Sequence, residues 1–190
     1  MLSQALIFLI QTVFGLFVVA LLLRFYLQWV RAPHRNPLSD FLHALTDFMV
    51  RPARRIVPGL WGLDLATLLL AWLVQLVEIL IVLQIQDFAP AQMAGPALGS
   101  AALLALVLLM KSGLYIVMVA IIMQVVLSWV SPNSPVMPLL NGMTRPVLRG
   151  FRRRIPPIGN VDLSPLFALV AAQLLLIPLE YLARSVAALL

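Results

Sequence analysis

The sequence predicts an all-α, polytopic membrane protein built from two parallel repeats. Composition supports the first half of this prediction, because 63% of the 190 residues are hydrophobic and only 11% are charged. Soluble proteins carry roughly 25% charged residues, and the mean hydropathy of this chain is +1.04. A water-soluble core cannot absorb this much apolar surface, so we expect the long apolar runs to cross a membrane as helices.

An internal repeat supports the second part of this prediction, the two parallel repeats. A basic segment with a proline and an aspartate occurs twice, and each position of the first copy lies 98 residues before its partner, as 144 − 46 = 98 shows for the first pair. Each copy stands between two apolar runs, which predicts two units of transmembrane helix, loop helix and transmembrane helix. The pairs are Thr46 and Thr144, Arg51 and Arg149, Arg54 and Arg152, Arg55 and Arg153, Val57 and Ile155, Pro58 and Pro156, Asp64 and Asp162, and Leu65 and Leu163.

The first repeat is expected to occupy residues 1–86, with spans at about 5–30 and 65–85 that suit about 30 Å of hydrocarbon. Between these spans, apolar residues recur at helical spacing on one side of the segment 37–50. This pattern predicts an amphipathic helix that lies in the headgroup plane. We expect Pro52 to end that helix, because proline disfavours a helix interior.

Residues 87–100 contain Pro90, Gly95 and Pro96 but no basic residue, so we predict an extracytoplasmic connector there. The second repeat then covers 101–190, with spans at about 112–130 and 163–186. The apolar run 98–110 leaves open an earlier start of the third span. Because Pro138, Gly142 and Pro146 interrupt the second loop helix, we expect it to be shorter than the first or broken.

Basic residues predict the orientation. Each repeat loop contains five arginines, whereas the connector contains none. By the positive-inside rule, both loops are expected in the cytoplasm and both termini outside. Trp29 and Trp129 stand where an interfacial aromatic belt is expected. The expected location is a bacterial inner membrane.

The repeated residues resemble the YggT family of bacterial membrane proteins. The resemblance rests on the Trp-Val pair, the threonine, the Arg-rich turn into proline and the following Asp-Leu, and it covers nearly the whole chain. The second copy matches better, through Arg152 to Pro157 and then Asp162, Ser164 and Pro165. We therefore expect the second copy to be the better formed. The resemblance implies links to cell division, nucleoid distribution, cytochrome b maturation or osmotic-stress tolerance, but no enzymatic activity.

Seven loop arginines are candidates for binding anionic lipid headgroups or a protein partner: Arg51, Arg54, Arg55, Arg149, Arg152, Arg153 and Arg154. The alternative is that their charge only fixes orientation. Residues expected to shape the repeated turn are Trp29, Trp129, Thr46, Thr144, Pro58, Pro156, Pro157, Asp64, Asp162, Ser164 and Pro165. We expect the two aspartates to cap the next helix and to pair with arginine; proton transfer is the alternative if they converge.

Six polar residues fall inside the apolar runs: Arg24, Gln75, Glu78, Lys111, Gln173 and Glu180. We expect Arg24 to snorkel toward the basic loop and the glutamines to make interhelical hydrogen bonds. Lys111 could pair with Glu78 or, at a better-matched depth, with Glu180, which is also spaced to pair with Arg184. An ion or proton path through Glu78 is the alternative.

Other chemistry finds little support in the sequence. The chain has no cysteine, and His34 and His43 lack an acidic ligand pattern, so no metal or cofactor is expected. No phosphate loop or nucleophile motif is present. The leading hypothesis is a non-enzymatic organising or assembly protein whose paired loops dock anionic lipid or a protein partner, with no role for nucleic acid. The alternative is a small oligomeric transporter or channel for ions or protons.

Overall fold

The computed structural model describes residues 2–31, 36–57, 64–86, 96–155 and 162–190. The described chain is all-α. Its helices are α1 (Leu2–Trp29), α2 (Pro37–Ile56), α3 (Leu65–Ile85), α4 (Pro96–Val130), α5 (Met137–Arg152) and α6 (Ser164–Ala187). Helices α1, α3, α4 and α6 are long and apolar enough to cross a membrane. The chain is therefore a membrane protein with four candidate spans, as the sequence predicts.

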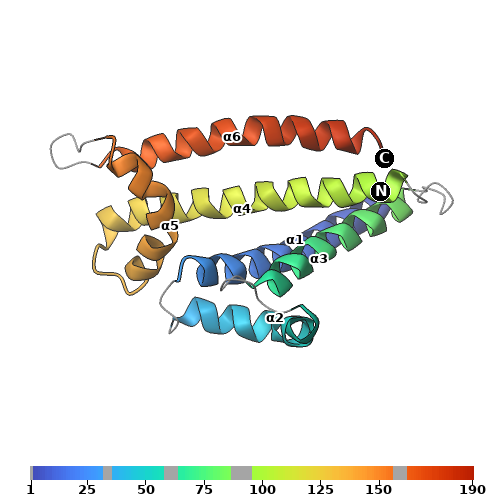
Figure 1. Cartoon of the computed structure of the whole chain (residues 1–190), viewed down its shortest axis with the longest axis horizontal. Helices are drawn as coiled ribbons and strands as arrows, with labels where there is room; N and C mark the ends of the chain where they lie inside the picture. Colours follow the sequence, from blue (N-terminus) through green and yellow to red (C-terminus); the bar gives the residue numbers. More distant parts are fainter. Residues whose placement is uncertain (1, 32–35, 58–63, 87–95, 156–161) are drawn as a thin grey trace.

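The two repeats have the same course. Helices α1 and α4 both begin at the end of the molecule where the two termini lie, and both run toward the loop helices α2 and α5 (Figure 1). Helices α3 and α6 return to the starting end. Within each repeat the two long helices pack together, α1 on α3 and α4 on α6. The repeats are therefore parallel, as expected.

One hydrophobic core joins the repeats. It contains Val18 and Leu21 from α1 together with Ile116 and Ala120 from α4, all buried. Polar contacts among the described residues also cross between the repeats. The Tyr26 hydroxyl donates to the carbonyl of Met143 in α5 at 2.5 Å, and the indole nitrogen of Trp72 in α3 donates to the carbonyl of Ala102 in α4 at 3.0 Å.

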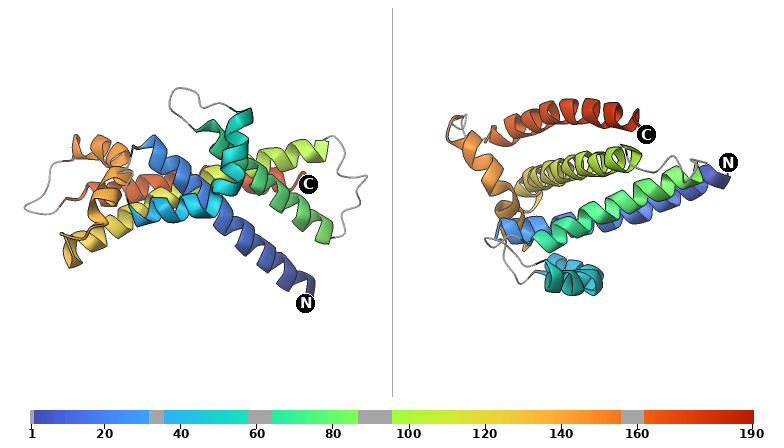
Figure 2. Two further views of the ribbon diagram at one scale, coloured as in Figure 1. Left: turned by 90° about the horizontal axis from the view of Figure 1, so that it is seen from below. Right: turned by 45° about the vertical axis from the view of Figure 1, so that its right-hand side comes forward.

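Helix α2 does not end at Pro52. It begins after Asn36, whose side chain accepts the amide of Ser39 at 2.8 Å, and it continues past Pro52 to Ile56. A proline removes one backbone hydrogen bond and bends a helix, and α2 changes direction along its length (Figure 2). The prediction that α2 ends at Pro52 was wrong. The helix accommodates the proline by bending, and the pair between Arg54 and Asp64, described below, holds its last turn in place.

Helix α2 buries only part of its apolar side. Leu42, Thr46 and Val50 form the buried stripe, at most 2% exposed, which packs between α1 and α3. Phe41 and Phe48 belong to the same predicted apolar side but are 61% and 69% exposed. The helix thus presents large apolar side chains that the rest of the chain does not cover.

The third long helix has the earlier start that the apolar run 98–110 left open. Helix α4 begins at Pro96, upstream of the span expected at about 112–130, and residues 96–100 of the predicted connector are helical. Lys111 made the boundary look later, but this side chain lies inside α4, and its ammonium is 3.8 Å from the Glu180 carboxylate on α6. Connector residues 87–95 lie outside the described part of the chain.

Prolines shape the second repeat without breaking its helices. Helix α5 has 16 residues against 20 in α2, so it is shorter, as expected, but it is continuous. Pro138 stands in the first turn of α5, where its missing N–H would have no helical partner, and Pro146 lies within the helix. Pro178 lies within α6 and does not end it.

Candidate functional site

Each loop helix is held to its repeat by two polar contacts. We call the first the threonine contact, which joins the loop helix to the preceding long helix through Thr46 or Thr144. We call the second the arginine–aspartate pair, which joins the end of the loop helix to the start of the next long helix. Both contacts use residues that the repeat pattern singled out. The partners of the two threonines, Arg24 and Gln124, were not expected.

In the first repeat, the partner of Thr46 is Arg24. The Arg24 Nη1 donates to the Thr46 hydroxyl and to Asp47 Oδ1, each at 2.7 Å, and the Thr46 hydroxyl donates to the Leu42 carbonyl at 2.6 Å. Thr46 is fully buried and Arg24 is only 5% exposed. Arg24 reaches the loop helix, as expected, but its side chain is buried against α2 and paired with Asp47.

In the second repeat, the partner of Thr144 is Gln124. The Thr144 hydroxyl lies within hydrogen-bond distance of Gln124 Oε1 and of the Leu140 carbonyl. The Gln124 amide nitrogen donates to Asn141 Oδ1 at 2.7 Å. Gln124 and Thr144 are both buried. The same contact is thus made by a charged side chain in one repeat and by a neutral one in the other.

Sequence reasoning missed Gln124, although a signal was present. The Trp-Val pairs at the ends of the first helix of each repeat differ by 129 − 29 = 100 positions, not 98. That offset matches Arg24 to Gln124, with a second loop that is two residues shorter. Using one offset throughout hid the correspondence.

The arginine–aspartate pairs occur in both repeats, as predicted. Arg54 Nε lies 3.1 Å from Asp64 Oδ2, and Arg152 Nε lies 2.8 Å from Asp162 Oδ2. Each aspartate also accepts a backbone amide at the start of the next helix, from Thr67 at 3.3 Å and from Ser164 at 2.9 Å. The two aspartates pair within their own repeats, and no contact joins them in the described part of the chain.

The two pairs differ in burial. The Asp64 side chain is 3% exposed and the Asp162 side chain 39%. Burial alone would raise the pKa of Asp64, but hydrogen bonds from Arg54 and Thr67 outweigh it and hold that pKa below its usual value. For Asp162, burial again acts upward, while Ser164 and then Arg152 bring the net pKa below its usual value.

Among the described residues, the pair of the first copy is the more buried one, whereas the turn prolines on which our expectation of a better-formed second copy rested are not described. Asp64 is the N-cap of α3 and also accepts the Thr67 hydroxyl. In the second copy the N-cap is Leu163, which makes no side-chain cap hydrogen bond. Ser164 and Pro165, which stand where the first copy has Ala66 and Thr67, are both buried at the start of α6. The predicted motif prolines Pro58, Pro156 and Pro157 lie outside the described residues.

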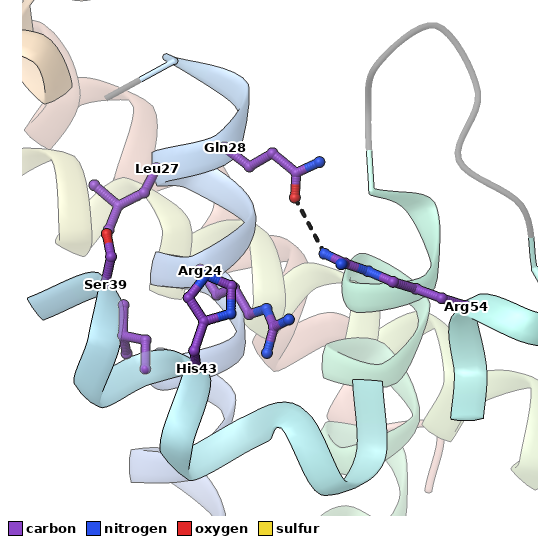
Figure 3. A pocket seen from close by; sticks show the side chains of 7 residues that line it. Arg24, Leu27, Gln28, Ser39, His43 and Arg54 are labelled. Atoms are coloured by element: carbon purple, nitrogen blue, oxygen red, sulfur yellow. Dashed lines mark hydrogen bonds between the residues drawn. The ribbon is translucent and has the colours of Figure 1, made fainter. Parts of the chain in front are cut away.

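A polar cavity lies beside the threonine contact of the first repeat. Its volume is about 280 Å³, and it opens between α1 and the first part of α2. Figure 3 shows Arg24 and His43 side by side, with Arg54 reaching from the other end toward Gln28. The lining residues are Arg24, Leu27, Gln28, Ser39, Leu42, His43 and Arg54, which include two guanidinium groups and no carboxylate.

The seven candidate arginines divide into two groups. Arg51 pairs with Asp47 at 2.7 Å, and Arg54 and Arg152 are in the aspartate pairs. The other four are exposed and form no ion pair with a described carboxylate: Arg55, Arg149, Arg153 and Arg154. Arg54 and Arg152 join two elements of the fold, Arg51 is exposed and pairs only within α2, and the four arginines of the second group are available for contacts outside the chain.

The structure gives partners for some of the polar residues inside the spans. Of the two alternatives for Lys111, the structure shows the pair with Glu180, which also lies 3.9 Å from Arg184. Gln75 donates to Glu78 of the same helix at 2.9 Å, and its expected interhelical bond is not found among the described residues. Gln173 is exposed and makes no such bond to any described residue. Glu78 is buried and forms no ion pair within the described chain.

Trp29 and Trp129 lie at the loop ends of α1 and α4, where they are 54% and 79% exposed. No group of three or more His, Asp or Glu side chains that could hold a metal ion occurs in the described part of the chain.

Comparison with known proteins reproduces the repeat. A family model described as CCB3/YggT matches twice, over residues 3–85 and 103–183. The chain belongs to the CCB3/YggT family. The two matches correspond to α1–α3 and α4–α6, so the family unit is the long helix, loop helix and long helix described above.

Several relatives of this CCB3/YggT chain extend over most of its length. An uncharacterised protein of Pseudomonas aeruginosa is 38% identical, covering 92% of this chain and 87% of its own. The uncharacterised protein YggT of Escherichia coli is 33% identical over 86% of this chain and 82% of its own. An uncharacterised protein of Vibrio alginolyticus is 32% identical over 87% of this chain and 88% of its own. No solved structure matches the chain.

Proposed function

We propose that this protein is a non-enzymatic organising or assembly protein of a bacterial inner membrane, whose two loop helices form a paired docking surface on the cytoplasmic face. The observation that carries the proposal is the fixed presentation of unpaired arginines. Each loop helix is held by a threonine contact and an arginine–aspartate pair. Four arginines beside these contacts remain exposed and without a described carboxylate.

The first loop helix has the chemistry of a membrane-surface helix. Phe41, Leu45 and Phe48 are exposed along α2, and Arg51 and Arg55 follow in the same helix. Apolar side chains beside basic ones suit the boundary between acyl chains and anionic headgroups. Each arginine near an anionic leaflet contributes on the order of 1 kcal/mol to membrane attraction. Lipid is therefore the proposed contact of α2.

The second loop helix offers charge with less apolar surface. Leu139, Leu140 and Leu148 of α5 are buried. Arg149, Arg153 and Arg154 are exposed near its C-terminal end. This combination favours electrostatic contact with anionic headgroups or with an acidic segment of a protein partner. Any link to osmotic stress or cell division would act through such a partner.

The test is charge reversal at the second loop. Arg153→Glu together with Arg154→Glu should abolish crosslinks from this loop in native membranes, while topology and abundance stay as in the wild type. Arg184→Glu is the matched control, because this exposed arginine lies near the other end of α6. Unchanged crosslinking in the double variant would refute docking. Reporter fusions in the loops test the orientation, and a periplasmic signal there would contradict it.

A second candidate function rests on Glu78. This carboxyl group is buried inside α3 and bonded only to Gln75 among the described residues. Ionisable groups in spans often mark ion or proton pathways. If the protein is a transporter, purified protein in liposomes should carry an ion or proton flux that Glu78→Gln abolishes. Absence of flux in the wild-type protein would leave docking as the better account.

A further inference from the structure

We infer that the polar cavity between α1 and α2 is a binding site for a phosphate group, with Arg24 as its principal ligand. The inference rests on the proposed function in one respect only, the expected position of α2 at the membrane surface.

Arg24 has an uncommitted edge. Both hydrogen bonds of its guanidinium leave from Nη1, to Thr46 and Asp47. Its Nε is buried and has no hydrogen-bond partner among the described residues. A buried N–H donor without a partner is costly, and the edge formed by Nε and Nη2 is the one that binds a phosphate or carboxylate through two parallel hydrogen bonds. Arg24 therefore has the geometry of an incomplete anion site.

The cavity supplies further donors and a positive field. Arg54 reaches into it, and Ser39, Gln28 and His43 complete its polar lining (Figure 3). The two carboxylates nearby are already shared with arginine, since Asp47 accepts from Arg24 and Arg51 and Asp64 accepts from Arg54. The two guanidinium groups that line the cavity, with no carboxylate in its lining, favour an anion. A volume of about 280 Å³ admits a phosphate with a small ester group.

The second repeat shows that a charge is not needed to hold the loop helix. There Gln124 makes the threonine contact with a neutral amide, and Asn141 stands where the first repeat has His43 (141 − 43 = 98). Burying a guanidinium costs several kcal/mol of hydration free energy, whereas an amide makes the same contact more cheaply. The ion pair with Asp47 accounts for the charge at Arg24 Nη1, since the counterpart of Asp47 in the second repeat is Arg145 (145 − 47 = 98), and the proposed ligand accounts for the edge that Asp47 leaves free.

Two sources could deliver the phosphate, a lipid headgroup and a soluble phosphate. Arg24 lies five residues before the loop end of α1, about 7.5 Å along the axis, which is within reach of a headgroup. The test uses the full chain, purified and stripped of lipid in detergent, and measures binding of three probes by native mass spectrometry. The probes are inorganic phosphate, phosphatidylglycerol and phosphatidylcholine with the same acyl chains.

Two variants and one control decide the outcome. Arg24→Gln copies the second repeat, and Arg24→Lys keeps the charge but removes the two-donor edge. We expect one saturable site in the wild type and a roughly ten- to a hundredfold weaker affinity in both variants, the range that charged hydrogen bonds provide. Arg149→Gln removes an exposed charge from the second loop and should leave the site unchanged. Thermal unfolding checks that each variant is folded. If Arg24→Gln does not fold, the affinity of Arg24→Lys is the deciding measurement.

Saturable binding of phosphatidylglycerol alone assigns the site to a headgroup, and binding of inorganic phosphate assigns it to a soluble phosphate; both support the inference. Binding no stronger than that of phosphatidylcholine, or an unchanged affinity in Arg24→Lys, would overturn it. The proposed docking function fails separately, through unaltered crosslinking after charge reversal at Arg153 and Arg154. The two experiments therefore distinguish failure of the phosphate site from failure of the docking function.

Discussion

The duplicated arginine–aspartate pair allows one stability prediction to be made twice in the same molecule. Asp64→Asn and Asp162→Asn remove the same charge from equivalent places. The first carboxylate is almost fully buried and accepts hydrogen bonds from both Arg54 and Thr67, whereas the second is 39% exposed. We expect the first substitution to be clearly the more destabilising.

The magnitudes follow from burial. Removing one partner of a fully buried pair costs about 3–5 kcal/mol. The Arg54 side chain is 42% exposed, so water can solvate it after the substitution, and an asparagine can keep part of the contact with Thr67. This lowers the expected loss for Asp64→Asn to about 2 kcal/mol. An exposed pair contributes about 0–1 kcal/mol, so Asp162→Asn should cost less than about 1 kcal/mol.

The assay is reversible unfolding in mixed detergent micelles, followed by circular dichroism, with the free energy of unfolding compared between wild type and variants. Arg54→Gln and the double variant complete a thermodynamic cycle that isolates the coupling between Arg54 and Asp64. Equal losses for Asp64→Asn and Asp162→Asn, or a larger loss for the second, would refute the argument from burial. A zero coupling energy would assign the loss to the Thr67 contacts instead.

Three further predictions use the same unfolding assay. Thr144→Val leaves the buried Gln124 carbonyl oxygen without its donor and should cost about 1–3 kcal/mol; a loss below about 0.5 kcal/mol would contradict the threonine contact. Tyr26→Phe removes the hydrogen bond to the Met143 carbonyl and should cost about 1 kcal/mol, whereas an unchanged free energy would mean that this contact adds nothing. Because the folded-state pKa of Asp64 is below its usual value, its contribution to the free energy of unfolding is complete above about pH 4 and lost as pH falls further. Asp64→Asn should therefore weaken the loss of stability at acid pH. A pH profile of stability that the substitution leaves unaltered would argue against this contribution.

Much of the fold could be predicted from the sequence because it depends on local patterns. Apolar runs long enough to span a bilayer indicated the four long helices. The repeat spacing indicated that Asp64 and Asp162 begin the return helices and pair with arginine. These features need only residues close in sequence, since Arg54 and Asp64 are separated by ten positions.

The site itself depends on contacts that sequence spacing does not reveal. Arg24 meets Thr46 from another helix, 22 positions away, and its counterpart Gln124 was hidden by the shorter second loop. Asp162, in the copy that matched the family better, is more exposed than Asp64, because burial of Asp64 follows from how α2 packs and not from motif identity. Lys111 made the start of α4 hard to place for a related reason. Its partner Glu180 lies on a different helix and cannot be found from spacing along α4.

Helix α4 has a consequence for the bilayer around the protein. At 35 residues it is about 52 Å long, whereas the 21 residues of α3 make about 31 Å, close to the hydrocarbon thickness of about 30 Å. The two helices cannot match one bilayer at the same tilt. Helix α4 must lean more steeply or extend into the headgroups, and α1 and α3 run at an angle to α4 and α6 (Figure 2). A change in acyl-chain length is therefore expected to act unequally on α3 and α4.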